Sequence, residues 1–276
     1  MENVRDFNQD LEMDFGRLAR YTRWLDVLDK KFGKPDNGDL IVLVGYPWMW
    51  KTEFSFFMSK QNLKKGNRVA YLSLELTKKQ LIHRIARKNA WVSYQDFQNG
   101  NYSERQIEII KQEIQWFKDQ KKLWMIWANN EPSIDEVEEL IRECNDKWFQ
   151  MIVIDNLGKI EWCATDLDRQ AKATSKLQTI KNELNLDITL LHHLRKPSKS
   201  DVLKPWWGSA FSGSQKIKDN CSVMVEIRRD LDPYETRPEK KAEVLFLQYK
   251  QTWDGITWAQ EMYFNRWEYN EHYIPN

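Results

Sequence analysis

The chain has 276 residues, of which 41% are hydrophobic and 30% charged, so it is long enough for one α/β domain with a substantial core and is neither disordered nor fibrous in composition. Its net charge of +1 excludes a general polycation, so any surface that binds nucleic acid must be a local basic patch. The longest apolar run, around residues 40–50, is too short to span a bilayer, and three scattered cysteines (Cys144, Cys163 and Cys221) fit a reducing cytoplasm rather than a disulfide framework.

The hydrophobic pattern alternates between strand-like and helix-like segments from residue 39 onward. Residues 1–36 are polar and carry no core of their own, so we expect a leader followed by a single domain over residues 37–276. In chain order, the pattern predicts a strand over 40–45, a helix over 52–64, a strand over 68–75, helices over 77–89, 103–121 and 133–147, a strand over 151–155, a helix over 168–185, strands over 188–192, 222–228 and 243–250, and a hairpin over 259–273.

Local signals mark several of these boundaries. Thr77 is placed to cap the helix that follows it, and Ser103 with Gln106 three residues later forms a capping-box pattern. The alternation of strands and helices predicts a mostly parallel, twisted α/β sheet flanked by helices, with an antiparallel edge near its end. Ligands of such sheets bind beyond the carboxyl ends of the strands.

The segment GYPWMWKT lies between a predicted buried strand and a predicted helix, which is the context of a phosphate-binding Walker A loop. Gly45, Lys51 and Thr52 match the first glycine, the lysine and the threonine of GxxxxGK[ST], but Trp50 stands at the second glycine. Lys51 would neutralise the β- and γ-phosphates, Thr52 would hold Mg²⁺, and the start of the helix would present N–H groups. A chance match between a strand and a helix is the alternative. The residues expected to contact nucleotide here are Gly45, Tyr46, Pro47, Trp48, Met49, Trp50, Lys51 and Thr52.

Two carboxylates follow other predicted strands. Asp155 ends MIVID, the position of a Walker B aspartate that orients Mg²⁺ and its waters. Glu75 ends a strand that we expect beside the P-loop, where it could polarise an attacking water. Taken singly, Asp155 could end an ordinary buried strand and Glu75 could be a helix-entry glutamate. Their combination with the Lys-Thr loop, in this order and spacing, predicts a P-loop enzyme that uses ATP and Mg²⁺.

From about residue 21 to residue 273, the chain resembles the RecA-type motor domain of DnaB-like hexameric replicative DNA helicases. The resemblance is carried by TRWLDVLDKKFGKPDNGDLIVLVGYPWMWKT, RVAYLSLELTKKQLIHRI, ARKNAWVSYQDFQNGNYSE and MIVIDNLGKIE. It implies a RecA-like fold and ATP hydrolysis coupled to movement along single-stranded DNA in replication, with Glu75 as the catalytic base. It also implies a homo-oligomeric ring with ATP between subunits, and primase and loader proteins as partners.

Two further segments resemble functional strands of that family. LLHHL resembles the sensor strand, where glutamine is usual at the position of His193, and His193 would report the γ-phosphate by hydrogen bonding. A strand end without a special role is the alternative for the pair His192–His193, and a zinc site is disfavoured because no cysteine has ligand spacing. FLQYKQTWDGITWAQEMYF resembles the strand that reaches the neighbouring subunit's ATP. Lys250 matches its lysine, but Thr252 replaces the arginine finger, which can be worth about 10³–10⁵ in rate.

Basic side chains gather between residues 195 and 218, against the single acid Asp201. Part of this stretch, FSGSQKIKDNCSVMVEIRRD, resembles the DNA-side segment and the next strand of the family. Such a loop facing the channel of a ring would suit sequence-independent contact with single-strand phosphates, and a solvated surface loop is the alternative. The residues are Arg195, Lys196, Lys199, Lys204, Lys216 and Lys218.

Tryptophan is unusually frequent and glycine unusually rare: the chain has 14 Trp and 10 Gly. Several tryptophans stand where the family has glycine or where a loop would favour it: Trp24, Trp50, Trp91 and Trp258 in the first group, and Trp48, Trp148, Trp206, Trp207 and Trp267 in the second. We hypothesise that a reassigned stop codon, which the gene uses for glycine, has been read as tryptophan; restoring about ten residues would bring glycine to its usual level of about 7%. Tryptophans such as Trp116, Trp124 and Trp253 can be genuine.

A degenerate ATPase is the competing interpretation. Trp50 would then fill the phosphate cradle, and the chain would be a RecA-fold regulator or DNA-binding scaffold with weak or no hydrolysis. The retention of Lys51, Thr52, Glu75 and Asp155 argues against it, because a dead site has no physical reason to keep them.

Overall fold

The computed structural model describes residues 38–45, 51–128, 130–194, 215–229, 243–251, 257–265 and 268–270. The strands are β1 (Leu40–Gly45), β2 (Val69–Ser73), β3 (Leu123–Trp127), β4 (Met151–Asp155), β5 (Asp187–His193), β6 (Val223–Arg229), β7 (Glu243–Gln251), β8 (Thr257–Asn265) and β9 (Glu268–Asn270). The helices are α2 (Lys51–Lys64), α3 (Lys78–Asn89), α4 (Tyr94–Asn99), α5 (Glu104–Asp119), α6 (Ile134–Asp146), α7 (Leu167–Leu184) and α8 (Gln215–Asn220), with a 3₁₀ turn η1 (Leu157–Lys159).

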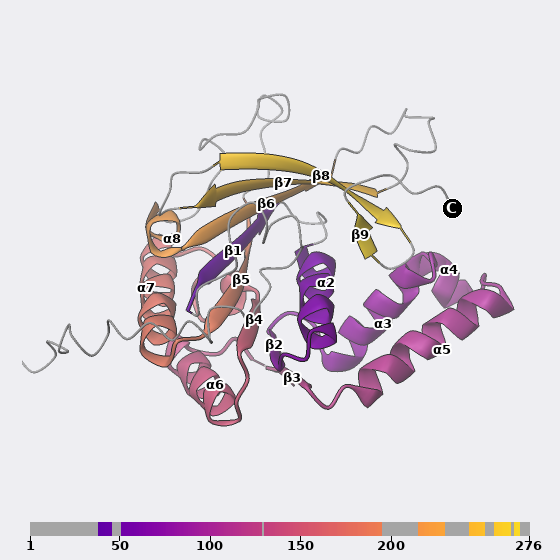
Figure 1. Ribbon diagram of the computed structural model, residues 1–276, viewed down its shortest axis with the longest axis horizontal. Coiled ribbons are helices and arrows are strands. Elements are labelled where there is room, and N and C mark those ends of the chain that lie inside the picture. The colour runs from indigo at the N-terminus through magenta and orange to yellow at the C-terminus, as the bar shows by residue number, and fades with distance from the viewer. Residues whose placement is uncertain are drawn as a thin grey trace, which may run out of the picture.

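The strands form one nine-stranded sheet in the order β3-β2-β4-β5-β1-β6-β7-β8-β9 (Figure 1). Neighbours from β3 to β6 pair in parallel, and the pairs from β6 to β9 are antiparallel. The predicted parallel sheet with an antiparallel edge is therefore confirmed. The expectation that the strand before Glu75 lies beside the P-loop strand is wrong, because β4 and β5 lie between β2 and β1. The parallel strands still end at the same edge of the sheet.

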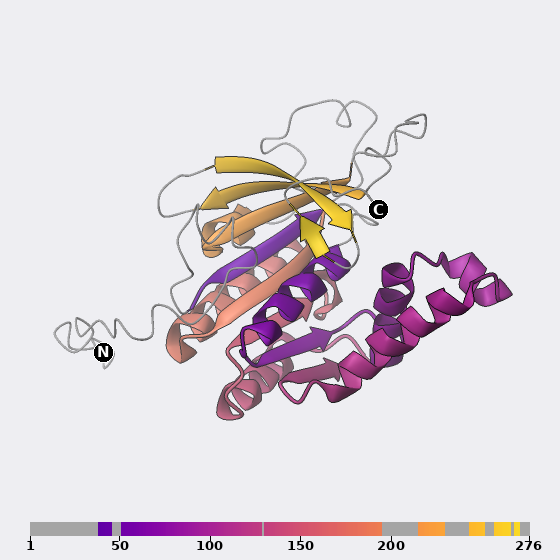
Figure 2. The ribbon, with the colours of Figure 1, turned by 45° about the vertical axis from the view of Figure 1, so that its right-hand side comes forward.

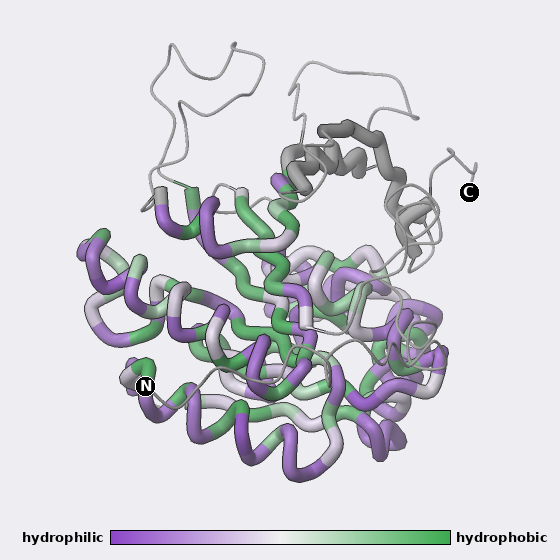
Figure 3. The backbone as a smooth tube through the Cα atoms, turned by 60° about the vertical axis from the view of Figure 1, so that its left-hand side comes forward, coloured by the Kyte–Doolittle hydropathy of each residue, from purple (hydrophilic) through white to green (hydrophobic). Residues whose placement is uncertain are grey.

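Helices cover both faces of the parallel strands, so β1, β2 and β4 are buried along their whole length. This explains why they appear in the sequence as continuous apolar runs. On one face, Phe56 of α2 packs against Tyr71 and Phe117, with ring centroids 5.0 and 5.1 Å apart. On the other face, α6 and α7 contribute Ile141 and Leu177 to a second apolar cluster. In Figure 3 the hydrophobic residues are concentrated along the central strands, and hydrophilic residues alternate with them along the outer helices.

The helix starts agree closely with the sequence signals. Thr77 caps α3 and Ser103 caps α5, each within a complete capping box. The sequence did not predict β3, α4 or α8. Strand β3 is an edge strand with mostly half-buried residues, so it lacks the buried run that marks the central strands. Helices α3, α4 and α5 stand together at this end of the sheet (Figure 2).

Three tryptophans adopt a backbone conformation that favours glycine. Trp91, Trp148 and Trp162 have φ of 55°, 61° and 64°, and Asn185 is the one other non-glycine residue with positive φ among the described residues. These three tryptophans are 47%, 76% and 62% exposed, so none of them belongs to the buried core. A left-handed residue with a Cβ costs about 1–2 kcal/mol, whereas glycine adopts this conformation readily.

Two of these tryptophans occupy the C-terminal helix position that glycine normally fills. Gly66 after α2, Trp91 after α3 and Trp148 after α6 close their helices with the same pair of backbone hydrogen bonds, the Schellman motif. These bonds run from Gly66 to Leu63 and Asn67 to Asn62, from Trp91 to Lys88 and Val92 to Arg87, and from Trp148 to Asn145 and Phe149 to Cys144, at 2.8–3.0 Å. The geometry agrees with the glycine hypothesis for Trp91 and Trp148 and adds Trp162 to the suspect positions.

Replacing Trp91, Trp148 and Trp162 together by glycine should stabilise the fold. The relief of three left-handed residues, at about 1–2 kcal/mol each, should raise Tm by about 6 °C or more in a thermal unfolding experiment. Trp124→Gly is the matched control. It should lower Tm, because the Trp124 ring packs against the ring of Phe149, with the two centroids 5.6 Å apart. A triple variant that melts at or below the temperature of the parent would contradict the assignment.

Candidate active site

The carboxyl ends of β1, β4 and β5 meet the first residue of α2 at one edge of the sheet. The Lys51 amine donates to the Gly45 carbonyl oxygen at 2.8 Å and lies 3.1 Å from Nδ1 of His193. Burial lowers the pKa of Lys51 to about 8, although the nearby charges of Asp155 and Glu75 act in the opposite direction. The amine is thus held beside the start of a helix, where backbone N–H groups favour an anion.

Thr52 and Asp155 form an oxygen pair next to this lysine. The Thr52 hydroxyl donates to Oδ2 of Asp155 at 2.9 Å, and both side chains are buried. Burial raises the pKa of Asp155 to about 6, while the hydrogen bond from Thr52 acts in the opposite direction. A hydroxyl and a carboxylate side by side are hard oxygen donors, and Mg²⁺ in nucleotide sites typically takes one or two protein oxygens together with substrate phosphates. The donor set therefore fits Mg²⁺ bound with a nucleotide.

Glu75 lies just beyond the end of β2, and its carboxylate faces the same site. The Asn156 amide donates to its Oε2 at 2.7 Å, and Nε2 of His193 lies 3.7 Å from that oxygen. The contact with His193 lowers the pKa of Glu75, against the opposing effect of burial. The carboxylate is therefore held in its ionised form, which is the form that a general base requires.

The structure also brings in residues that the sequence interpretation missed. The Tyr71 hydroxyl donates to Oδ2 of Asp155 at 3.0 Å and lies 2.8 Å from the Ser55 hydroxyl. Burial raises the pKa of Tyr71 well above its usual value, so its hydroxyl stays protonated. On the outer side, Arg84 of α3 binds Glu53 with two hydrogen bonds of 2.8 and 3.3 Å. The sequence signal for Tyr71 is a hydroxyl between the apolar residues Ala70 and Leu72 of a predicted buried strand.

Several predicted site residues lie outside the described residues or are described only in part. Lys250 pairs with Met224 and Thr257 through the backbone of β7, but its side chain is not described. Lys216 and Lys218 lie on α8, where Lys216 is exposed and Lys218 half-buried. The predicted residues outside the described ranges are Trp24, Tyr46, Pro47, Trp48, Met49, Trp50, Arg195, Lys196, Lys199, Lys204, Trp206, Trp207, Thr252 and Trp267.

His192, which precedes His193 in β5, is buried and makes stability depend on pH. Burial, followed by the nearby His193 and Lys51, lowers the pKa of His192 to about 4 from its usual 6.5. The unfolded state therefore binds the proton first on acidification, so this contribution to stability is present above pH 6.5 and is lost as the pH falls through 4. His192→Phe should show a weaker loss of unfolding free energy between pH 7 and pH 4, by up to about 3 kcal/mol, in urea titrations. Equal pH dependence in both proteins would contradict this prediction.

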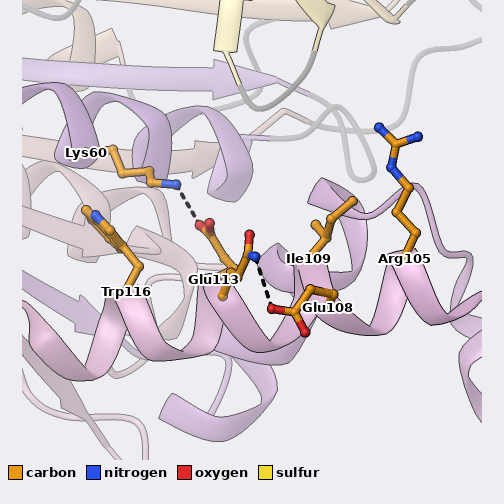
Figure 4. Close-up of a pocket in the computed structure, with 7 residues that line it drawn as sticks. Lys60, Arg105, Glu108, Ile109, Glu113 and Trp116 are labelled. Atoms are coloured by element: carbon orange, nitrogen blue, oxygen red, sulfur yellow. Dashed lines mark hydrogen bonds and ion pairs between the residues drawn. The ribbon is translucent and has the colours of Figure 1, made fainter.

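A surface hollow of about 640 Å³ lies away from these residues, between α2 and α5 (Figure 4). Among the residues that line the hollow, the Lys60 amine forms an ion pair with Oε1 of Glu113 at 2.7 Å. The same amine lies 4.6 Å from the centroid of the Trp116 ring. None of the predicted nucleotide-site residues lines this hollow.

The fold and the site together define a P-loop ATPase type of domain: a strand, a Lys-Thr helix start and an aspartate at the end of a parallel strand in the same sheet. The chain belongs to the family described as "DnaB-like helicase C terminal domain", whose model matches residues 22–266. That assignment confirms the resemblance stated on the sequence motifs.

Relatives and solved structures agree with this family. The chain is similar to a "Probable replicative DNA helicase" of Trieres chinensis, with 25% identity over 217 residues, which cover 75% of the chain and 46% of that protein. It is also similar to the "Replicative DNA helicase DnaB" of Rickettsia typhi, with 24% identity over 87% of the chain and 51% of that protein. The chain thus spans about half the length of the curated relatives it matches.

A solved structure described as an ATPase domain has a TM-score of 0.77 to this fold at 17% identity, with 95% of each chain covered. This likeness, together with the parallel sheet, establishes the RecA-like α/β fold. None of the described helices is long and apolar enough to cross a membrane. The three cysteines are buried and form no disulfide with one another.

Proposed function

We propose that the chain is an ATP-dependent DNA helicase motor, which couples nucleoside triphosphate hydrolysis to movement along single-stranded DNA in replication. The observation that carries the proposal is the convergence of Lys51, the Thr52–Asp155 pair and Glu75 at one edge of the sheet. Lys51 would contact the β- and γ-phosphates, and Thr52 and Asp155 would hold Mg²⁺, which neutralises phosphate charge when bound. The motor domain would cover residues 37–276, with residues 1–36 as a leader.

Hydrolysis would use the remaining side chains of the site. Glu75 would accept a proton from the attacking water, and His193, which lies between Lys51 and Glu75, would respond to the γ-phosphate. Lys250 would reach the nucleotide of a neighbouring subunit in a homo-oligomeric, hexameric ring. The basic residues between 195 and 218 would contact the phosphates of the DNA strand.

Partners and location are proposed by analogy with the family. The solved structure entitled "The Structure Of A DnaB-Like Replicative Helicase And Its Interactions With Primase" has a TM-score of 0.77 to this chain at 17% identity, covering 95% of this chain and 64% of that one. By analogy, primase and loader proteins would be partners of this chain, and it would work in the cytoplasm.

The alternative is a RecA-fold regulator or DNA-binding scaffold with weak or no hydrolysis, which Trp50 at a glycine position would favour. Two assays distinguish the motor from the scaffold: ATP hydrolysis with and without single-stranded DNA, and strand displacement. Both are made on the chain in which the suspect tryptophans are replaced by glycine. The motor predicts stimulation by single-stranded DNA together with strand displacement. Hydrolysis that DNA does not stimulate, without displacement, would favour the scaffold.

A further inference from the structure

Within the described part of the chain, the side-chain contacts of each carboxylate of the site go to a single oxygen. Thr52 and Tyr71 both donate to Oδ2 of Asp155, and Asn156 and His193 both contact Oε2 of Glu75. Among the described residues, no side chain donates to Oδ1 of Asp155 or to Oε1 of Glu75. These second oxygens are the ones that we expect to meet the reactants.

Thr52 and His193 already have roles in the proposed nucleotide site, whereas Tyr71 and Asn156 do not. We propose that Tyr71 and Asn156 are positioning residues, which fix Oδ2 of Asp155 and Oε2 of Glu75 so that the opposite oxygen of Asp155 would serve Mg²⁺ and that of Glu75 the attacking water. This inference rests on the proposed function and assigns a role to two residues that would act through Asp155 and Glu75.

The burial of Tyr71 supports an active role for its hydroxyl. The side chain is fully buried between the apolar neighbours Ala70 and Leu72 of β2, and burying a hydroxyl is costly unless it makes hydrogen bonds. Tyr71 reaches Asp155 from β2, the strand next to β4, and the Ser55 hydroxyl at 2.8 Å completes its hydrogen bonding. A phenylalanine would fill the same space and would keep the ring contact with Phe56.

The side chain of Asn156 is equally constrained. It is buried, and its amide nitrogen points to Glu75, which is itself half-exposed. Its amide oxygen faces Gly158, where an added Cβ would lie only 3.1 Å from it, tighter than usual contacts. Glycine at position 158 therefore leaves room for the orientation in which the amide nitrogen, and not the oxygen, meets the glutamate.

The role of Tyr71 is tested by nucleotide binding rather than by turnover. In the full chain carrying Trp50→Gly, the affinity for a fluorescent ATP analogue is measured with Mg²⁺ and with EDTA. Tyr71→Phe should lower the affinity about tenfold with Mg²⁺ and leave it unchanged in EDTA, because the lost hydrogen bond orients a metal-binding carboxylate. Tyr102→Phe, in the α4–α5 connection, is the matched control and should change neither value. An affinity of Tyr71→Phe equal to that of the parent with Mg²⁺, or reduced equally in EDTA, would overturn the assignment.

The role of Asn156 is tested by measuring kcat and the affinity for Mg·ATP separately. Asn156→Leu, which is nearly isosteric, should lower kcat about tenfold while the affinity for Mg·ATP stays the same. In a Glu75→Gln background the same change should have no further effect, because Asn156 acts through Glu75. Asn99→Leu, on exposed α4, is the control. A reduced kcat that persists in the Glu75→Gln background, or a kcat equal to that of the parent, would overturn the role.

The parent chain separates this inference from the proposed function. If the Trp50→Gly chain binds Mg·ATP and hydrolyses it while the two variants behave like that parent, only the positioning roles fail. If the parent itself binds no Mg·ATP, the proposed function fails and the positioning roles fail with it.

Discussion

Replacing Trp50 by glycine is expected to raise the affinity for Mg·ATP by at least about a hundredfold. A phosphate-cradling loop needs a backbone that approaches the phosphates closely and adopts positive φ, which glycine does at little cost. An indole at this point blocks the approach and removes charge-assisted N–H contacts that are worth about 1.5–3 kcal/mol each. Since about 1.4 kcal/mol corresponds to a tenfold change in affinity, the loss of even two contacts gives this factor. Equilibrium titration with a fluorescent ATP analogue measures it.

Trp116→Gly serves as the control, because Trp116 lies on α5 and lines the hollow that none of the predicted nucleotide-site residues lines, so its replacement should leave nucleotide binding unchanged. The gene supplies an independent check. Under the glycine hypothesis the codons for positions 50, 91, 148 and 162 are UGA, whereas those for Trp116 and Trp124 are UGG. A UGG codon at position 50, or Trp50→Gly without any gain in affinity, would favour the degenerate scaffold.

Glu75→Gln, made in the Trp50→Gly chain, is expected to lower kcat by about 10²–10⁴ while leaving the affinity for Mg·ATP within about twofold. The amide has nearly the shape of the carboxylate and can remain near Asn156, but it cannot accept a proton from the attacking water. Because Glu75 is half-exposed and ionised, its replacement adds no buried unpaired charge.

Single-turnover hydrolysis and equilibrium binding measure the two effects of Glu75→Gln separately. Glu139→Gln, on the exposed side of α6, is the matched control and should leave both unchanged. Turnover of Glu75→Gln within about tenfold of the parent would exclude Glu75 as the base. A parallel loss of affinity would instead indicate a role in binding.

Much of the fold can be predicted from the sequence, because its signals are local. The central strands are continuous apolar runs because helices cover both of their faces. The caps Thr77 and Ser103 can be predicted because each bonds to a backbone N–H only three residues further along the chain. Strand β3 is different, since an edge strand is only half-buried and leaves a weaker pattern. The order of the strands is not local either, which is why the sequence pattern wrongly places β2 beside β1.

The residues of the candidate site also fall into those that local sequence motifs predict and those that depend on the order of the strands. Lys51, Thr52 and Asp155 belong to contiguous motifs whose chemistry demands those residues, so their sequence context is sufficient to propose them. The contacts of Tyr71 with Asp155 and of Asn156 with Glu75 join residues more than 80 positions apart, and they depend on which strands are neighbours. The left-handed backbone of Trp162 could not be predicted, because it follows the turn η1, which has no sequence signature.

The central claim is that this edge of the sheet binds the triphosphate of Mg·ATP through Lys51. The most direct test is the equilibrium dissociation constant for Mg·ATP of the Trp50→Gly chain, measured with and without Lys51→Ala. Loss of the ammonium contact should raise Kd by about 10- to 100-fold, as expected for a charge-assisted contact, without lowering Tm. A Kd that Lys51→Ala leaves unchanged would contradict the assignment of a nucleotide site to this edge.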